Sequence, residues 1–140
     1  MGSIMNRFVI GLACALGLTF GAMASPDPWY RGGRISTVEA EMKATFAPGS
    51  CLTGTFISAS TSALAIPKVR VRRDAEFWFH HAQFPNAKSP WDINPSGTVY
   101  LLRNFKPKLR RDILARLPEN TGYVTYTGSD LIASYGFRPC

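Results

Sequence analysis

Two cysteines, Cys51 and the C-terminal Cys140, most constrain what this chain of 140 residues can fold into. A third cysteine, Cys14, lies in an N-terminal segment with the features of an export signal, which would be removed from the mature protein. Exported proteins fold in an oxidising compartment, where an even number of cysteines indicates disulfides. We therefore expect a bond between Cys51 and Cys140, which ties the last residue to the middle of the chain.

The N-terminal segment, residues 1–24, is predicted to be a cleaved export signal. Arg7 gives it a positive start, residues 8–20 are apolar, and Ala22-Met23-Ala24 has the small-x-small form of a cleavage site. The apolar run is shorter than the about 20 residues of a membrane-spanning helix, so we expect no transmembrane anchor in the mature chain. The alternative is a lipoprotein signal ending at Cys14, which the continuation of the apolar run beyond that cysteine disfavours.

Residues 25–140 are expected to form a single compact domain, located in the periplasm or secreted. The whole chain carries 16 Lys+Arg and 9 Asp+Glu, a net charge of +7. Removing Arg7 with the signal leaves 15 against 9, or +6. This excess favours an acidic protein or an anionic polymer as partner and also admits a nucleic acid. Eleven of the positive residues are arginines, which suit bidentate contacts to phosphate or carboxylate.

Hydrophobic periodicity predicts an α+β fold, in which a small antiparallel sheet is packed on one side by two short helices. A partly closed barrel is the alternative. The expected helices are residues 36–46, with Ser36 as cap, and residues 106–117, with Pro107 in the first turn. The expected strands are residues 51–57, 68–81, 98–103, 123–127 and 131–137. Residues 84–97 are rich in turn formers and are expected to form a long loop.

The stretch RRDAEFWFHH, residues 72–81, contains both histidines of the chain and is where catalysis would most plausibly lie. If it is a strand, His80 and His81 point to opposite faces and cannot share a metal. Glu76 and His80 then lie about 13 Å apart along the strand, which rules out direct proton relay. In a helix Glu76 and His80 would be adjacent, but the Phe-Trp-Phe composition favours the strand. No C-x-x-C motif is present, and we expect neither a metal nor a cofactor.

Binding residues are expected on two basic faces. Arg70, Arg72 and Trp78 share the polar face of the predicted strand with His80, where they could hold phosphates and stack rings. Arg110 and Arg111 lie on the predicted helix 106–117, and Arg103 joins either face only if the fold brings it near. The alternative for both faces is that the charges are simply solvated.

A turn at Arg31-Gly32-Gly33-Arg34 could approach a phosphate. However, neither the phosphate-loop nor the dinucleotide-binding fingerprint follows it, so the sequence alone does not support a nucleotide site there.

Three functions remain open on these residues. The leading hypothesis is a non-catalytic exported binding domain, of an inhibitor, immunity or adhesion type, that recognises an acidic protein or an anionic envelope component. The second is a secreted phosphodiester-cleaving toxin that uses His80 or His81 with Glu76 as an acid–base pair. The third is a subunit of a secreted or surface assembly, with an aromatic interface. The residues expected in that interface are Trp29, Tyr30, Trp78 and Trp91.

The signal assignment predicts a mature chain that begins at Ser25. Expression of the full-length gene in a bacterial host, followed by N-terminal sequencing of the protein in the periplasmic or medium fraction, should return Ser-Pro-Asp-Pro. A chain that still begins at Met1, or one that begins at an acylated Cys14, would contradict the assignment.

Overall fold

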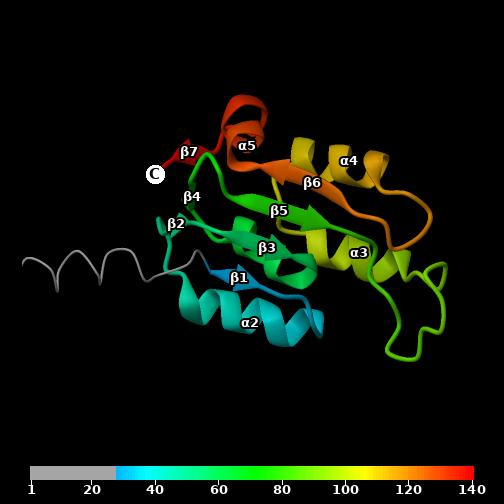
Figure 1. Ribbon diagram of the computed structural model, residues 1–140. Coiled ribbons are helices and arrows are strands. Elements are labelled where there is room, and N and C mark those ends of the chain that lie inside the picture. The colour runs from blue at the N-terminus through cyan, green and yellow to red at the C-terminus, as the bar shows by residue number, and fades with distance from the viewer. Residues whose placement is uncertain (1–27) are drawn as a thin grey trace, which may run out of the picture.

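The computed structural model describes residues 28–140, so the predicted export signal, its cleavage site and Cys14 lie outside the described residues. The described chain forms two small sheets and five helical segments (Figure 1). The four-stranded sheet has the order β1-β3-β5-β6 and consists of β1 (Trp29–Tyr30), β3 (Thr55–Ile57), β5 (Glu76–Phe79) and β6 (Val124–Thr127). The three-stranded sheet has the order β2-β4-β7 and consists of β2 (Cys51–Leu52), β4 (Arg70–Val71) and β7 (Arg138–Pro139).

Helices account for much of the remaining chain. They are α2 (Ile35–Thr45), the 3-10 helix η1 (Ser58–Ala65), α3 (Pro95–Leu102), α4 (Pro107–Arg116) and α5 (Gly128–Tyr135). The prediction of an α+β fold with one disulfide is confirmed. The prediction of two helices is wrong, because η1, α3 and α5 are helical as well.

The sheets are not the antiparallel sheet that the sequence suggested. β1 pairs with β3, β3 with β5, β2 with β4, and β4 with β7, all in parallel. Among the strands of residues 28–140 the antiparallel pair is β5 with β6, and an isolated antiparallel bridge joins Gln83 to Ile93. β1 and β6 are the open edges of the larger sheet, so the alternative of a partly closed barrel is wrong as well. Parallel pairing needs long crossover connections, and η1 lies in two of them, the one from β2 to β4 and the one from β3 to β5.

Two expected strands each divide at a bend. The segment 51–57 leaves the three-stranded sheet after β2 and enters the four-stranded sheet as β3, with Gly54 at φ +84° between them. The segment 68–81 does the same at a turn over residues 72–75, in which the Ala75 amide donates to the Arg72 carbonyl. In a continuous strand Arg73 would share a face with the buried residues Val71 and Phe77, and the turn removes this conflict. Each segment therefore contributes one strand to each sheet.

Two other expected strands are helices because local caps outweigh their β-like composition. The segment 98–103 falls in α3, where the Asn94 side chain accepts a hydrogen bond from the Gly97 amide and Pro95 starts the helix. The segment 131–137 falls in α5, where Thr127 and Asp130 form a reciprocal capping box.

The two expected helices are confirmed as α2 and α4. Their buried apolar residues recur at helical spacing, as the sequence indicated. The expected cap of the first helix is wrong. α2 starts one residue before Ser36, with Arg34 as N-cap and with no side-chain capping hydrogen bond.

The core lies between one face of the four-stranded sheet and the helices α2, η1, α3 and α4. Tyr30, Phe56 and Phe77 stack across three neighbouring strands, with ring centroids 4.7 Å and 5.1 Å apart. On β5 the alternation is regular: Phe77 and Phe79 are buried, and Glu76 and Trp78 are half-buried on the other face. Burial of these rings removes the largest apolar side chains from water, which is the main stabilising contribution here.

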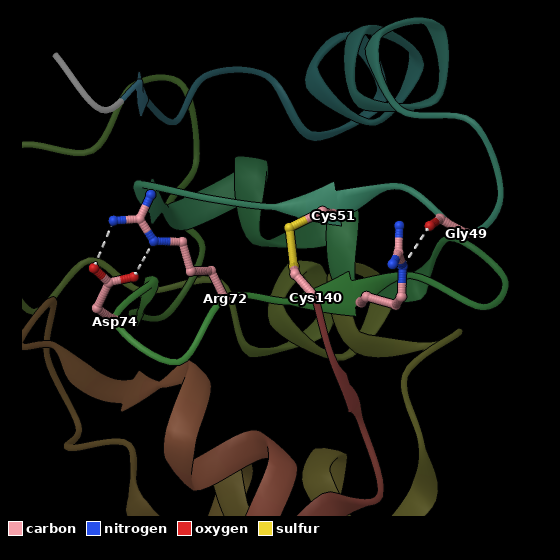
Figure 2. Close-up of a disulfide and its surroundings, with 6 residues drawn as sticks. Gly49, Cys51, Arg72, Asp74 and Cys140 are labelled. Atoms are coloured by element: carbon pink, nitrogen blue, oxygen red, sulfur yellow. Dashed lines mark hydrogen bonds and ion pairs between the residues drawn. A yellow bond between two sulfur atoms is a disulfide. The ribbon is translucent and has the colours of Figure 1, made fainter. Parts of the chain in front are cut away.

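The predicted disulfide between Cys51 and Cys140 is present and joins β2 to the C-terminus (Figure 2). The Cα atoms of the two cysteines lie 5.5 Å apart, a common separation for such bonds. The bond closes a loop with a sequence separation of 89 residues. A loop of this length contributes about 4–5 kcal/mol in the chain-entropy model, which matters for strands of only two residues.

Substitution of Gly54, at the bend between the two sheets, should destabilise the protein more than substitution of Gly49, which precedes β2. Gly49 and Gly54 both have φ near +80°, but a methyl group at Gly49 would meet open space, whereas at Gly54 it would overlap the Pro28 carbonyl oxygen. We expect Gly49→Ala to lower the free energy of unfolding by about 1 kcal/mol, from left-handed strain alone. Gly54→Ala should cost about 3 kcal/mol or more, because overpacking adds to that strain. Urea unfolding of both variants measures the difference, and equal costs would contradict the close approach.

Candidate functional site

The carboxyl ends of the parallel strands β1, β3 and β5 meet at one edge of the four-stranded sheet. Arg31 directly follows β1, Ser58 follows β3, and His80 follows β5. These three residues line a cleft of about 1030 Å³, which we call the carboxyl-edge cleft. In open α/β sheets, ligands bind in crevices outside the carboxyl ends of the strands. The position of the cleft therefore makes it the leading candidate site.

The lining of the carboxyl-edge cleft is cationic. Arg31 and Arg34 flank a pair of glycines between β1 and α2, and His80 enters from β5. The lining contains no aspartate or glutamate. The Arg31 guanidinium lies 5.3 Å from the centre of the Trp29 ring, a cation–π contact that holds the side chain near the sheet. An anionic group would find opposite charges here without a competing carboxylate.

The amino end of α2 adds to this positive character. Ile35 and Ser36, the first residues of the helix, line the cleft. No side chain caps this helix end, and its first turn has no acidic residue. The first amides of a helix have no partner within the helix and carry a partial positive charge. The chain reaches this position through Gly32, where an added methyl group would lie 2.6 Å from Cβ of Ser58. Only glycine allows so close an approach of the two segments.

Two exposed tyrosines provide ring surfaces in the cleft. Tyr100 of α3 and Tyr123, which precedes β6, are 49% and 52% exposed. The Tyr123 ring packs edge-on against the rings of Trp78 and His80, at centroid distances of 5.5 Å and 5.2 Å. The ring of Tyr123 is thus fixed from behind while much of it stays open to solvent.

His80 is oriented so that one ring nitrogen remains available. Its Nδ1 lies 2.6 Å from the carbonyl oxygen of His81. Because a carbonyl can only accept, Nδ1 carries the proton in this contact. In the neutral ring Nε2 is then the unprotonated nitrogen, which can accept a hydrogen bond or a proton.

His81 has a different environment. Its Nδ1 lies 3.0 Å from Thr98 Oγ1, on the buried side of α3, and His81 is not among the residues that line the cleft. Burial lowers the pKa of His81, and the positive charge of His80 lowers it further. His81 is therefore a packing residue that holds α3 against the end of β5, whereas His80 faces the cleft.

Glu76, the third residue of the predicted catalytic set, is also absent from the cleft lining. Its carboxylate accepts a hydrogen bond of 3.0 Å from Trp78 Nε1, two residues along β5. The structure thus brings only His80 of the three predicted catalytic residues to the cleft. Trp78 supports the cleft from behind through Tyr123.

The two arginines predicted on the same strand face lie on or beside β4, in the other sheet. Arg70 donates from Nε to the Gly49 carbonyl at 3.1 Å. Arg72 forms an ion pair of 2.7 Å with Asp74, close to the disulfide (Figure 2). The bend at residues 72–75 separates these side chains from Trp78 and His80, so they do not form one continuous basic face.

Two of the other three arginines predicted to bind a partner, Arg103 and Arg110, make contacts within the protein. Arg103 holds both carboxylate oxygens of Glu39, at 2.7 and 2.8 Å, and lies 3.8 Å from the Tyr100 ring centre. The hydrogen bond with Glu39 raises the pKa of Arg103. Arg110 donates to the Arg103 carbonyl at 3.2 Å. Arg111 is exposed on α4 and does not line the carboxyl-edge cleft.

Of the aromatic residues predicted for an assembly interface, Trp29 and Trp78 are in edge-on contact, with ring centroids 6.3 Å apart. Tyr30 packs on Phe56 in the core, and Trp78 is half-buried. Trp29 and Trp91 are 55% and 71% exposed, the first on β1 and the second in the loop before α3.

Sequence reasoning missed the arginines and tyrosines that define the cleft. A usable signal was present in Arg31-Gly32-Gly33-Arg34, because a glycine pair between a strand and a helix often marks a close backbone approach. The longer phosphate-binding fingerprints are absent, and the turn by itself does not specify a binding site. No local signal marked Tyr100 and Tyr123, which only the fold brings to the same place.

Within residues 28–140, no group of three or more histidine, cysteine or acidic side chains is arranged to hold a metal ion. The same part of the chain contains no helix long and apolar enough to cross a membrane. No protein-family model matches the chain, and neither the curated proteins nor the solved structures gave a match.

The lowered pKa of His81 predicts a loss of stability at acidic pH. The unfolded chain takes up a proton on His81 near pH 6.5, whereas the folded protein resists this until the pH is lower. The free energy of unfolding should therefore fall as the pH drops from 7.5 to 5. Urea unfolding at both values should show a smaller fall in His81→Gln than in the unchanged protein. An identical fall in both proteins would contradict the assignment.

Proposed function

We propose that this protein is an exported basic binding domain that holds an anionic group of its partner in the carboxyl-edge cleft. The observation that carries the proposal is the grouping of Arg31, Arg34 and His80 around one cleft whose lining has no carboxylate. Charge-assisted hydrogen bonds from guanidinium groups to phosphate or carboxylate are among the strongest available to a binding site. The uncapped amino end of α2 supports binding of the same kind of group.

The shape of the site favours an anionic envelope component over an acidic protein surface. A cleft of about 1030 Å³ can enclose a protruding group, whereas interfaces between proteins are broad and bury most of their area on flatter surfaces. The half-exposed rings of Tyr100 and Tyr123 line the same cleft as Arg31 and Arg34 and suit packing against a sugar ring. The ligand class that fits both features is a sugar that carries a phosphate or carboxylate group.

A phosphodiester-cleaving enzyme is the second candidate, and His80 favours it. Its Nε2 is available to act as a base, and two arginines in the same cleft could stabilise a phosphate. Acid–base cleavage also needs a second proton-transferring group. Glu76, the predicted partner, bonds to Trp78 and does not line the cleft. The non-catalytic role therefore has the better support.

The proposal predicts binding of a sugar phosphate that depends on Arg34. Isothermal titration of the mature protein with glucose 6-phosphate should show saturable binding, weaker binding of inorganic phosphate, and weak or no binding of glucose. Arg34→Gln should weaken glucose 6-phosphate binding by about tenfold or more, since a hydrogen bond between charged groups is worth about 1.5–3 kcal/mol. Arg111→Gln removes the same charge outside the cleft and is the matched control.

Equal affinities in Arg34→Gln, Arg111→Gln and the unchanged protein would overturn the proposed site. Incubation of the mature protein with RNA tests the second candidate in parallel. Cleavage that is lost in His80→Ala and kept in His81→Ala would establish the enzyme in place of the binding domain.

A further inference from the structure

A second cavity, of about 460 Å³, lies between the end of η1, the segment that joins α3 to α4, and β7. Three cationic side chains line it: Lys68, Lys106 and Arg138. Asn104 and Phe137 also line it, and its lining contains no carboxylate. It shares no lining residue with the carboxyl-edge cleft. We call it the C-terminal cavity.

The strand pairing beside this cavity places two like charges opposite each other. Arg70 of β4 and Arg138 of β7 are direct partners in the parallel register, and both are exposed. Like charges directly opposite each other on a sheet are destabilising. In the described part of the chain the ion pairs are Arg72 with Asp74 and Arg103 with Glu39, so neither Arg70 nor Arg138 is neutralised there by a carboxylate.

Lys106 brings a third positive charge to a fixed position. Its Nζ donates to the Tyr135 carbonyl at 3.1 Å and lies 4.1 Å from the centre of the Phe137 ring. Burial lowers the pKa of Lys106. The ammonium has three donors, and one of them is used by the Tyr135 carbonyl.

A purely structural role explains part of this arrangement. Lys106 and Lys108 donate to the carbonyls of Tyr135 and Ser134 at the carboxyl end of α5, where cations stabilise a helix. That role accounts for Lys106 and Lys108. It gives no reason for Lys68 and Arg138 to line the same cavity without a carboxylate.

We propose that the C-terminal cavity is a separate binding site for a tetrahedral oxyanion, a phosphate or sulfate group, held by Lys68, Lys106 and Arg138. An oxyanion there neutralises the cations and relieves the repulsion across β4 and β7. The phosphate can be free or part of a lipid headgroup. The site acts independently of the carboxyl-edge cleft.

The test compares the disulfide-bonded mature protein with two double variants. Lys68→Gln/Arg138→Gln removes two charges from the cavity, and Lys88→Gln/Arg111→Gln removes two exposed charges elsewhere. We expect sodium phosphate to raise the melting temperature above that in sodium chloride of equal ionic strength. This rise in melting temperature should persist in the control variant Lys88→Gln/Arg111→Gln and in Arg34→Gln. In the cavity variant Lys68→Gln/Arg138→Gln the dissociation constant for phosphate should increase by about tenfold or more. Cooperative melting in chloride shows that each variant is folded.

Vesicles identify the source of the phosphate group. If free phosphate has no specific effect, sedimentation with phosphatidic acid vesicles that is lost in the cavity variant alone assigns the site to a lipid headgroup. If neither phosphate nor vesicles distinguish the cavity variant from the control, the proposal is wrong. If Arg34→Gln alone removes the effect of phosphate on the melting temperature, the anion binds in the carboxyl-edge cleft. The proposal for the C-terminal cavity is then wrong.

Discussion

The stacking of three aromatic rings across parallel strands is the interaction on which the candidate site depends. Tyr30, Phe56 and Phe77 lie side by side on the inner face of β1, β3 and β5. Their contact fixes the register of strands that are only two to four residues long. Because the three strands run in the same direction, their carboxyl ends are brought to one edge. Arg31 and His80 meet there although they are far apart in the sequence.

The arginines differ in whether they are paired with a carboxylate within the fold. Arg103 and Arg72 are paired with carboxylates, and Arg110 bonds to a backbone carbonyl. These contacts hold α2, α3 and α4 together or stabilise a turn, and they leave those guanidinium groups less able to bind a partner. Arg31 and Arg34 have no carboxylate beside them in the cleft. A net positive charge is thus a poor guide to a binding surface until internal pairs are removed from it.

The disulfide stabilises the three-stranded sheet. β2, β4 and β7 have two residues each, and so few backbone hydrogen bonds do not hold a sheet in water. The bond from Cys51 to Cys140 fixes β7 next to β4 and thereby brings Arg138 opposite Arg70. The disulfide thereby helps to hold Arg138, one of the three cations that line the C-terminal cavity.

The sequence alone determined the features that depend on local pattern or on simple chemistry. The cysteine count predicted the disulfide, the apolar spacing predicted α2 and α4, and the alternation over Glu76–Phe79 predicted β5 and its buried face. The composition of 98–103 and 131–137 pointed to strands, and capping by Asn94 and Thr127 made both helical instead.

Only the tertiary structure decided which strands run in parallel and which charges remain without a partner. Gly54 and the turn at residues 72–75 move the chain from one sheet to the other, so two apparent strands became four. No local sequence feature distinguishes Arg103 from Arg34, but Arg103 is paired with Glu39 whereas Arg34 lines the carboxyl-edge cleft. The physical reason is that a charge is neutralised by its neighbours in space, and those neighbours are 64 residues away for Arg103.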